Sequence, residues 1–154
     1  MRGYSLASTW RLPAPVERCW GVLADPTFTW PLWWPGVVAR RVAPAPDGLV
    51  GSVATMVFRS PLRYVLVLEL RVVDAYPPHH VVMSADGDLV GHATARLTAL
   101  AADRTRLDIQ SDVVPTRRWM LWTGPLMAPL FRAVHAAMMR DGERGLARYL
   151  TVTA

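Results

Sequence analysis

The sequence predicts a single α+β domain, residues 1–154, in which a curved antiparallel sheet wraps around a long C-terminal helix. Two observations carry this prediction. From Gly36 to Val114 the chain alternates apolar and polar residues, which is typical of strands with one buried face. From Trp119 to Leu150 the apolar residues recur at helical spacing. The long helix is the only large element available to cover the apolar face of the sheet.

The composition excludes several classes of protein. Hydrophobic residues make up 52% of the chain, too many for a disordered protein. All 17 basic residues are arginine, and they are spread along the sequence, which favours a solvated basic surface over a nucleic-acid site. The single cysteine, Cys19, excludes an internal disulfide, and we expect a buried thiol. Without a signal-peptide core or an unbroken membrane-spanning run, we expect a cytoplasmic protein without stable membrane insertion, either a monomer or a homodimer.

Three elements precede the main sheet. Tyr4 to Leu12 predicts a first strand, and Pro15 can open a short helix that ends near Ala24. The segment from Thr27 to Trp34 then carries four aromatic residues, Phe28, Trp30, Trp33 and Trp34. This segment is too short and too rich in proline for a core helix. It is either a lid or rim of a cavity, or an aromatic plug that fills one end of the core.

Turn-forming residues divide the next part of the chain into six strands. The predicted strands are Val37 to Ala43, Gly51 to Arg59, Arg63 to Asp74, His80 to Asp86, Leu89 to Ala101 and Arg104 to Val114. Ser60-Pro61-Leu62 indicates a hairpin between the second and third of them. We predict that Phe58 pairs with Tyr64, which places Met56 beside Leu66 and Ala54 beside Leu68 on the inner face.

Small side chains face each other across the predicted core. They are Ala93, Ala95 and Ser111 in the strands and Gly124, Ala128 and Gly142 on the helix stripe. Because these residues do not fill the space between sheet and helix, we predict an internal cavity of roughly 300–1,000 Å³. The candidate ligand-binding residues are Trp30, Trp33, Trp34, Met56, Phe58, Leu66, Leu68, Met83, Ala95, Ile109, Ser111, Phe131 and Met138.

His135 and Tyr64 are the candidate catalytic residues. His135 lies in the middle of the apolar helix stripe, whose regular part we expect to begin near Pro129. Apolar burial would lower the pKa of His135 and leave a neutral imidazole that can accept or donate a proton near pH 7. Tyr64 is a second inward polar group that can orient a ligand carbonyl. The alternative is a core histidine satisfied by a backbone carbonyl, by Tyr64 or by Tyr149.

No other group of residues in the sequence has the spacing of a catalytic, phosphate-binding or metal-binding motif. The adjacent pair His79-His80 has no Cys/His cluster to support it as a metal site. A phosphate-binding glycine loop and a nucleophile elbow are both missing from the sequence. Asp86 and Asp88 flank Gly87 and are typical turn residues. The sequence therefore predicts neither a metal nor another cofactor.

Several short sequence motifs resemble those of a known protein superfamily. They are Trp33-Trp34-Pro35-Gly36-Val37, Gly87-Asp88-Leu89 followed by Gly91, Trp119-Met120, Pro129-Leu130-Phe131-Arg132, and Gly142-Glu143 before Gly145-Leu146. Together with the order of elements, they resemble the SRPBCC or START-like helix-grip superfamily, and within it a bacterial subgroup labelled polyketide cyclase/dehydrase. The resemblance implies the helix-grip fold of START domains and plant-allergen-like ligand carriers, and a hydrophobic ligand.

The chain also departs from that subgroup. The subgroup tends to carry Arg-Trp-Asn-His-Asp on its last helix, where this chain keeps Arg132 and His135 but has Ala133, Val134 and Ala136 at the other three positions. It also tends to place aromatic residues where this chain has Ala95, Ile109 and Ser111. These departures imply a wider and less polar cavity.

Two functions fit this cavity. One is a cofactor-independent bacterial enzyme of secondary metabolism, which cyclises or dehydrates a polyketide-like intermediate that the cavity holds folded. His135 and Tyr64 on inner faces favour the enzyme. The other is a non-catalytic carrier or sensor of an apolar ligand such as a lipid or quinone, favoured by the lack of a second acid or base. A weaker third idea is that the tryptophan segment docks on a membrane or partner.

Overall fold

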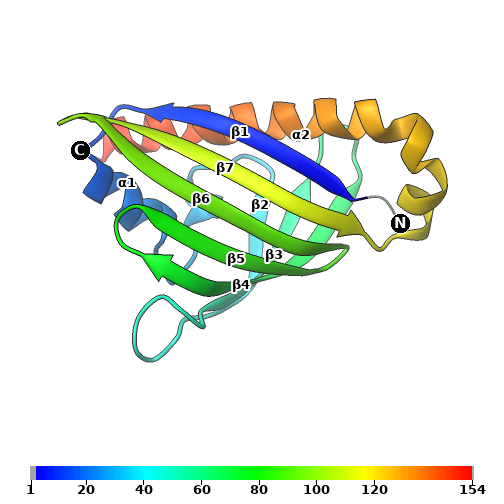
Figure 1. Ribbon diagram of the computed structural model, residues 1–154, viewed down its shortest axis with the longest axis horizontal. Coiled ribbons are helices and arrows are strands. Elements are labelled where there is room, and N and C mark those ends of the chain that lie inside the picture. Colours follow the sequence, from blue (N-terminus) through cyan, green and yellow to red (C-terminus); the bar gives the residue numbers. More distant parts are fainter. Residues whose placement is uncertain (1–2, 154) are drawn as a thin grey trace.

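The computed structural model describes residues 3–153, although the side chains at positions 119 and 123–125, Gly124 among them, lie outside the described part. One seven-stranded antiparallel sheet has the strand order β1-β7-β6-β5-β4-β3-β2 (Figure 1). Its strands are β1 (Tyr4–Leu12), β2 (Val37–Ala43), β3 (Val53–Arg59), β4 (Val65–Tyr76), β5 (His80–Gly87), β6 (Leu89–Ala101) and β7 (Arg104–Pro115). The helices are α1 (Val16–Leu23), the 3-10 turn η1 (Trp30–Leu32) and α2 (Arg118–Val152). The predicted α+β fold class is confirmed.

The long helix α2 is held along the sheet by its contacts with β1 and α1. Figure 1 shows α2 running beside β1, with α1 near the C-terminal end of the helix. Glu143 on α2 accepts a hydrogen bond from the backbone N–H of Arg11, at 2.8 Å. Arg18 on α1 donates to the carbonyl of Leu150 at 2.9 Å. These bonds satisfy an edge-strand donor and a carbonyl of the last helical turn, groups that would otherwise lack a partner.

The pairing of β3 with β4 differs from the prediction by two residues. Phe58 lies opposite Leu66 rather than Tyr64, and Met56 lies opposite Leu68. The connecting loop is longer than expected, because Arg63 adopts a positive φ of 67° and Ser60 N–H donates to the Tyr64 carbonyl at 3.0 Å. Tyr64 therefore lies in the loop rather than in the strand. A shift of two residues keeps every side chain on its predicted face, because the strand period is two.

The start of α2 also differs from the prediction. The helix begins at Arg118 and continues through Pro125 and Pro129, so the expectation of a start near Pro129 is wrong. A proline fits the helical φ but removes one backbone hydrogen bond, so it can bend a helix without ending it. Figure 1 shows the opening turns at a steep angle to the rest of α2.

Three tryptophans form the centre of the core at one end of the sheet. The ring centroids of Trp10 and Trp34 lie 5.4 Å apart, and those of Trp33 and Trp34 lie 5.6 Å apart in a stacked pair. Gly142 accommodates this cluster, because a Cβ at that position would lie 2.7 Å from the Trp34 ring. The expectation that Gly142 leaves open space between the sheet and the helix is therefore wrong. Indole rings fill that space, and they make Trp33 and Trp34 part of the core.

Candidate functional site

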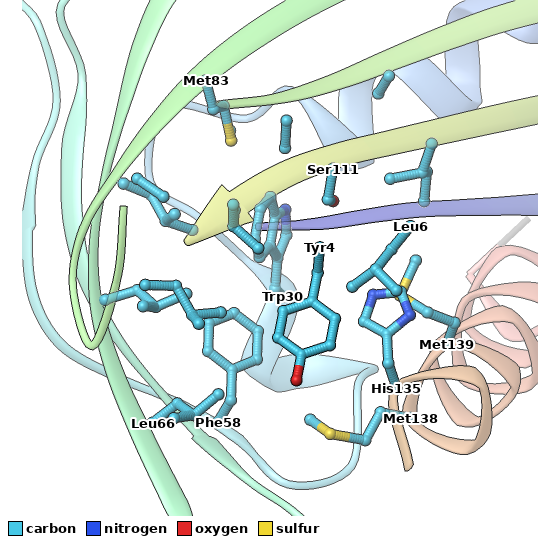
Figure 2. Close-up of a pocket in the computed structure, with 18 of the residues that line it drawn as sticks. Tyr4, Leu6, Trp30, Phe58, Leu66, Met83, Ser111, His135, Met138 and Met139 are labelled. Carbon is cyan, nitrogen blue, oxygen red and sulfur yellow. The ribbon is translucent and has the colours of Figure 1, made fainter. Parts of the chain in front are cut away.

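A cavity of about 240 Å³ lies between the inner face of the sheet and α2 (Figure 2). It is smaller than the lower end of the predicted range. Trp10, Trp30 and Trp34 occupy one end of the space, and Met138 and Met139 project into it from α2. Bulky side chains thus take up the volume that the small residues of β6 and β7 leave open.

Most of the residues that the sequence singles out line this cavity. They are Trp30, Trp34, Phe58, Tyr64, Leu66, Leu68, Met83, Ala95, Ile109, Ser111, Phe131, His135 and Met138. For the strand residues the reason is alternation, which places residues two apart on the same face of the sheet. Phe131, His135 and Met138 share the inner face of α2 through the helical period.

Met56 and Trp33 do not line the cavity, which corrects their place among the candidate ligand-binding residues. Met56 is fully buried in the core. The ring of Trp33 packs edge-on against Trp10 at 6.2 Å and lines a separate surface groove beside Gly145. The orientation of Trp33 is set by the packing of three tryptophans in the tertiary structure. It could not be predicted from the spacing of residues along the chain.

His135 places an imidazole in the apolar cavity. Figure 2 shows the ring near Leu6, Tyr4 and Met139. Among the described residues, neither ring nitrogen has a hydrogen-bond partner, so neither a backbone carbonyl nor Tyr149 satisfies it. Burial lowers the pKa of His135 from its ordinary value of 6.5. The imidazole is therefore neutral near pH 7, and one ring nitrogen carries a free lone pair.

Two tyrosines flank Phe131 on the cavity wall. The Tyr64 and Phe131 rings meet edge to face with centroids 6.1 Å apart, and the Tyr4 and Phe131 rings do so at 6.2 Å. Burial raises the pKa of Tyr64, an effect that a hydrogen bond with Ser60 opposes. Burial likewise raises the pKa of Tyr4, while the nearby Arg132 guanidinium lowers it. Both phenols are protonated at neutral pH and can donate a hydrogen bond.

Tyr4 is a polar cavity-lining residue that the sequence analysis did not predict. It is the first residue of β1, and Leu6 and Trp10, which share its parity along the strand, also line the cavity. That alternation is readable in the sequence, so parity with Leu6 would have identified Tyr4 as inward-facing. The guanidinium carbon of Arg132 lies over the Tyr4 ring, 5.6 Å from its centre.

Few polar groups remain available to a ligand. The indole N–H of Trp30 donates to the Leu23 carbonyl at 3.1 Å, and that of Trp34 donates to the Met138 carbonyl at 3.0 Å. These two rings therefore offer only apolar surface. Polar side chains on the wall are those of Tyr4, Tyr64, Ser111 and His135, and the rest of the wall is almost entirely apolar. Within residues 3–153, no group of acidic, histidine or cysteine side chains has the arrangement of a metal site.

This architecture is that of a helix-grip protein, and comparisons with known proteins agree with it. Residues 5–151 match the family described as polyketide cyclase/dehydrase and lipid transport, and the chain belongs to that family. Comparison with curated proteins found no match. No described helix combines the length and apolar character needed to cross a bilayer.

Three solved structures illustrate the shared fold. A START superfamily protein from Mycobacterium smegmatis has a TM-score of 0.77 at 15% identity, covering 97% of this chain and 99% of its own. A protein from Thermus thermophilus has a TM-score of 0.77 at 16% identity, and the match covers 98% of this chain and 99% of that protein. The Zhui aromatase/cyclase from a Streptomyces species has a TM-score of 0.73 at 19% identity, and the match covers 97% of this chain and 94% of that protein. At these identities the likeness establishes the fold alone.

Proposed function

We propose that the cavity binds a hydrophobic small molecule and that the protein cyclises or dehydrates a polyketide-like biosynthetic intermediate. The observation that carries this proposal is the placement of His135. Its imidazole lies in an apolar cavity without a hydrogen-bond partner among the described residues, and burial keeps it neutral. A neutral imidazole beside a bound ligand can act as a general base and then as a general acid.

The proposed reaction is an intramolecular aldol condensation followed by loss of water. A ring nitrogen of His135 takes a proton from a methylene group between two carbonyls, and the resulting enolate carbon attacks a ketone carbon. The new alkoxide takes the proton back from the imidazolium, while the Tyr64 phenol donates a hydrogen bond to that oxygen. His135 then takes a second proton from the same carbon, and the departing hydroxide recovers it and leaves as water. No oxidant or reductant is needed.

The cavity wall supplies the other part of catalysis by holding the chain folded. Bringing two reacting carbons together within one molecule can lower the barrier by several kcal/mol, about 7–11 in the best cases. An apolar cavity of about 150 Å³ holds benzene. At about 240 Å³, this cavity is suited to a product of one or two rings rather than a long extended chain. Mobile side chains such as Met138 and Met139 can adapt to the changing shape.

A non-catalytic carrier is the second candidate, and one observation favours it. Apart from His135, the polar side chains on the wall are the hydroxyl groups of Tyr4, Tyr64 and Ser111, and none of the described lining residues carries a carboxylate. Such a wall can bind a lipid or quinone by its apolar surface with one or two hydrogen bonds. The carrier and the enzyme share the binding step and differ only in turnover.

Turnover of a defined probe separates the two functions. A synthetic linear tetraketide thioester is incubated with the protein, and the cyclised, dehydrated product is followed by mass spectrometry through the loss of water. We expect acceleration by the unchanged protein, and a loss of about a hundredfold or more in kcat for His135→Phe and His135→Ala. KM should change much less in both variants.

Melting temperature and probe binding control this experiment. Tyr64→Phe should fold normally and lose less turnover than His135→Phe, because the phenol only donates a hydrogen bond. Full turnover in a well-folded His135→Phe protein would end the catalytic role of His135. Binding of the probe without any acceleration by the unchanged protein would favour the carrier instead.

A further inference from the structure

The outer face of the opening turns of α2 exposes large apolar side chains to solvent. Trp122 is 81% exposed, Leu126 is 87% exposed and Leu130 is 39% exposed. They are four residues apart and so form one stripe along the helix. A helix that faces a core on one side normally carries polar residues on the other side. Thirteen consecutive residues, 119–131, instead contain no charged side chain.

Positive charge surrounds this stripe. Residues 113–140 contain four arginines and no aspartate or glutamate. Arg117 forms an ion pair with Asp88, whose Oδ1 lies 3.2 Å from its Nε. Arg118 and Arg132 are exposed at the two ends of the apolar run. The stripe therefore combines exposed apolar surface with flanking cations.

The loop between β3 and β4 lies beside the same turns of α2. Tyr64 at the end of this loop contacts Phe131 through an edge-to-face ring pair. Just before it, Leu62 is 50% exposed and Arg63 follows. The loop thus repeats the combination of an exposed apolar side chain and an arginine. We define the docking surface as Trp122, Leu126 and Leu130 with Arg118, Arg132, Leu62 and Arg63.

We propose that this docking surface binds the surface of an anionic phospholipid bilayer. Tryptophan and leucine side chains insert at the boundary between headgroups and acyl chains, and arginine pairs with lipid phosphates. A second copy of this chain fits less well. A two-fold interface would bring the docking surface against itself, and residues 113–140 offer no carboxylate to pair with the opposing arginines.

Docking would place one wall of the cavity at the bilayer. Met120 and Phe131 lie on the same opening turns as Trp122 and Leu130, yet they are buried and line the cavity. These turns also contain Pro129, which has no N–H to bond the carbonyl of residue 125. An apolar ligand dissolved in the bilayer would then have a short path to the cavity. This inference goes beyond the proposed reaction, since it holds for an enzyme and for a carrier.

Vesicle binding tests the docking surface. The full chain is centrifuged with vesicles made of equal parts phosphatidylglycerol and phosphatidylcholine, and the bound fraction is measured. We expect binding that the double substitution Trp122→Gln and Leu126→Gln weakens at least tenfold. Arg118→Gln should weaken it about fivefold, and about 0.5 M sodium chloride should weaken it further. Vesicles of phosphatidylcholine alone should bind much less.

Leu32→Gln is the matched control. Leu32 on η1 is also exposed but lies outside the docking surface, so this variant should bind vesicles like the unchanged protein. All variants should keep their melting temperature, because the substituted side chains are exposed. The proposal is overturned if the unchanged protein does not bind anionic vesicles, or if the double variant binds them equally well. It is also overturned if the double substitution abolishes a dimer in sedimentation velocity without any vesicle binding.

Discussion

The indole N–H of Trp34 donates a hydrogen bond of 3.0 Å to the backbone carbonyl of Met138. This bond joins the aromatic segment near the N-terminus to the middle of α2, three residues after His135. The side chains of Trp34 and His135 both line the cavity. The position of the aromatic segment and the position of the candidate acid–base group are therefore coupled through one contact.

Trp34→Ala should lower the free energy of unfolding by about 3–5 kcal/mol, as expected for the truncation of a buried aromatic residue. Urea unfolding followed by circular dichroism measures the change. Trp122→Ala is the control, because Trp122 is exposed and its loss should change stability by no more than about 0.5 kcal/mol. A Trp34→Ala protein of unchanged stability but weaker ligand binding would make Trp34 a gate rather than a core residue.

Gly145→Ala should destabilise the protein by about 3 kcal/mol or more. A Cβ at this position would lie 1.8 Å from the backbone carbonyl oxygen of Trp33, so the helix or the aromatic segment has to move. Gly21→Ala provides the opposite case in α1, since a Cβ there meets no atom within 4 Å. That change should stabilise the protein by about 0.5–1 kcal/mol through helix propensity. Equal melting temperatures for the two variants would contradict the packing described for Gly145.

His135 should make the stability of the protein depend on pH below about 6.5. Burial lowers its pKa in the folded state, so as the pH falls through 6.5 the unfolded chain takes up a proton that the folded protein excludes. The free energy of unfolding therefore falls between about pH 6.5 and the lower folded-state pKa, by at most about 1.4 kcal/mol per pH unit. Above pH 6.5 this contribution is fully present.

Urea unfolding at pH 7.5 and pH 5.0 checks this pH dependence. His135→Phe should lose less stability than the unchanged protein between these two values. His92→Gln is the control for the replacement of a histidine, because His92 is exposed on β6. An unaltered pH dependence in His135→Phe would show that the imidazole is solvated in the folded protein.

Ala95→Leu should block the cavity without unfolding the protein. Ala95 lines the cavity on β6, so the added carbons enter empty space. Binding of 2-naphthol, an apolar bicyclic probe with one hydroxyl, should weaken at least tenfold, as measured by its fluorescence. Ala99→Leu on the same strand is the control, because Ala99 is exposed and does not line the cavity. Equal affinity in the two variants would place the probe elsewhere.

Much of the candidate site follows from alternation along the strands. The pattern in β7 predicts that Leu107, Ile109 and Ser111 face inward, and all three line the cavity. The predicted faces of β3 and β4 also hold despite the register error at Phe58, because a shift of two residues preserves the face. The same alternation would have placed Tyr4 on the inner face of β1. Helical periodicity likewise places His135 and Met138 on the inner side of α2.

The sequence by itself determined the order of elements, the faces of the strands and the helix stripe that carries His135, because these depend on local periods of two and 3.6 residues. Only the tertiary structure decided how the space between those faces is filled. Trp33 and Trp34 pack against Trp10, and Gly142 makes room for the Trp10 and Trp34 rings. The cavity is therefore only about 240 Å³, and neither Trp33 nor Met56 lines it. The exposure of Trp122 and Leu126 was decided in the same way. Packing between segments distant in sequence depends on side-chain shape in three dimensions, which no period along the chain records.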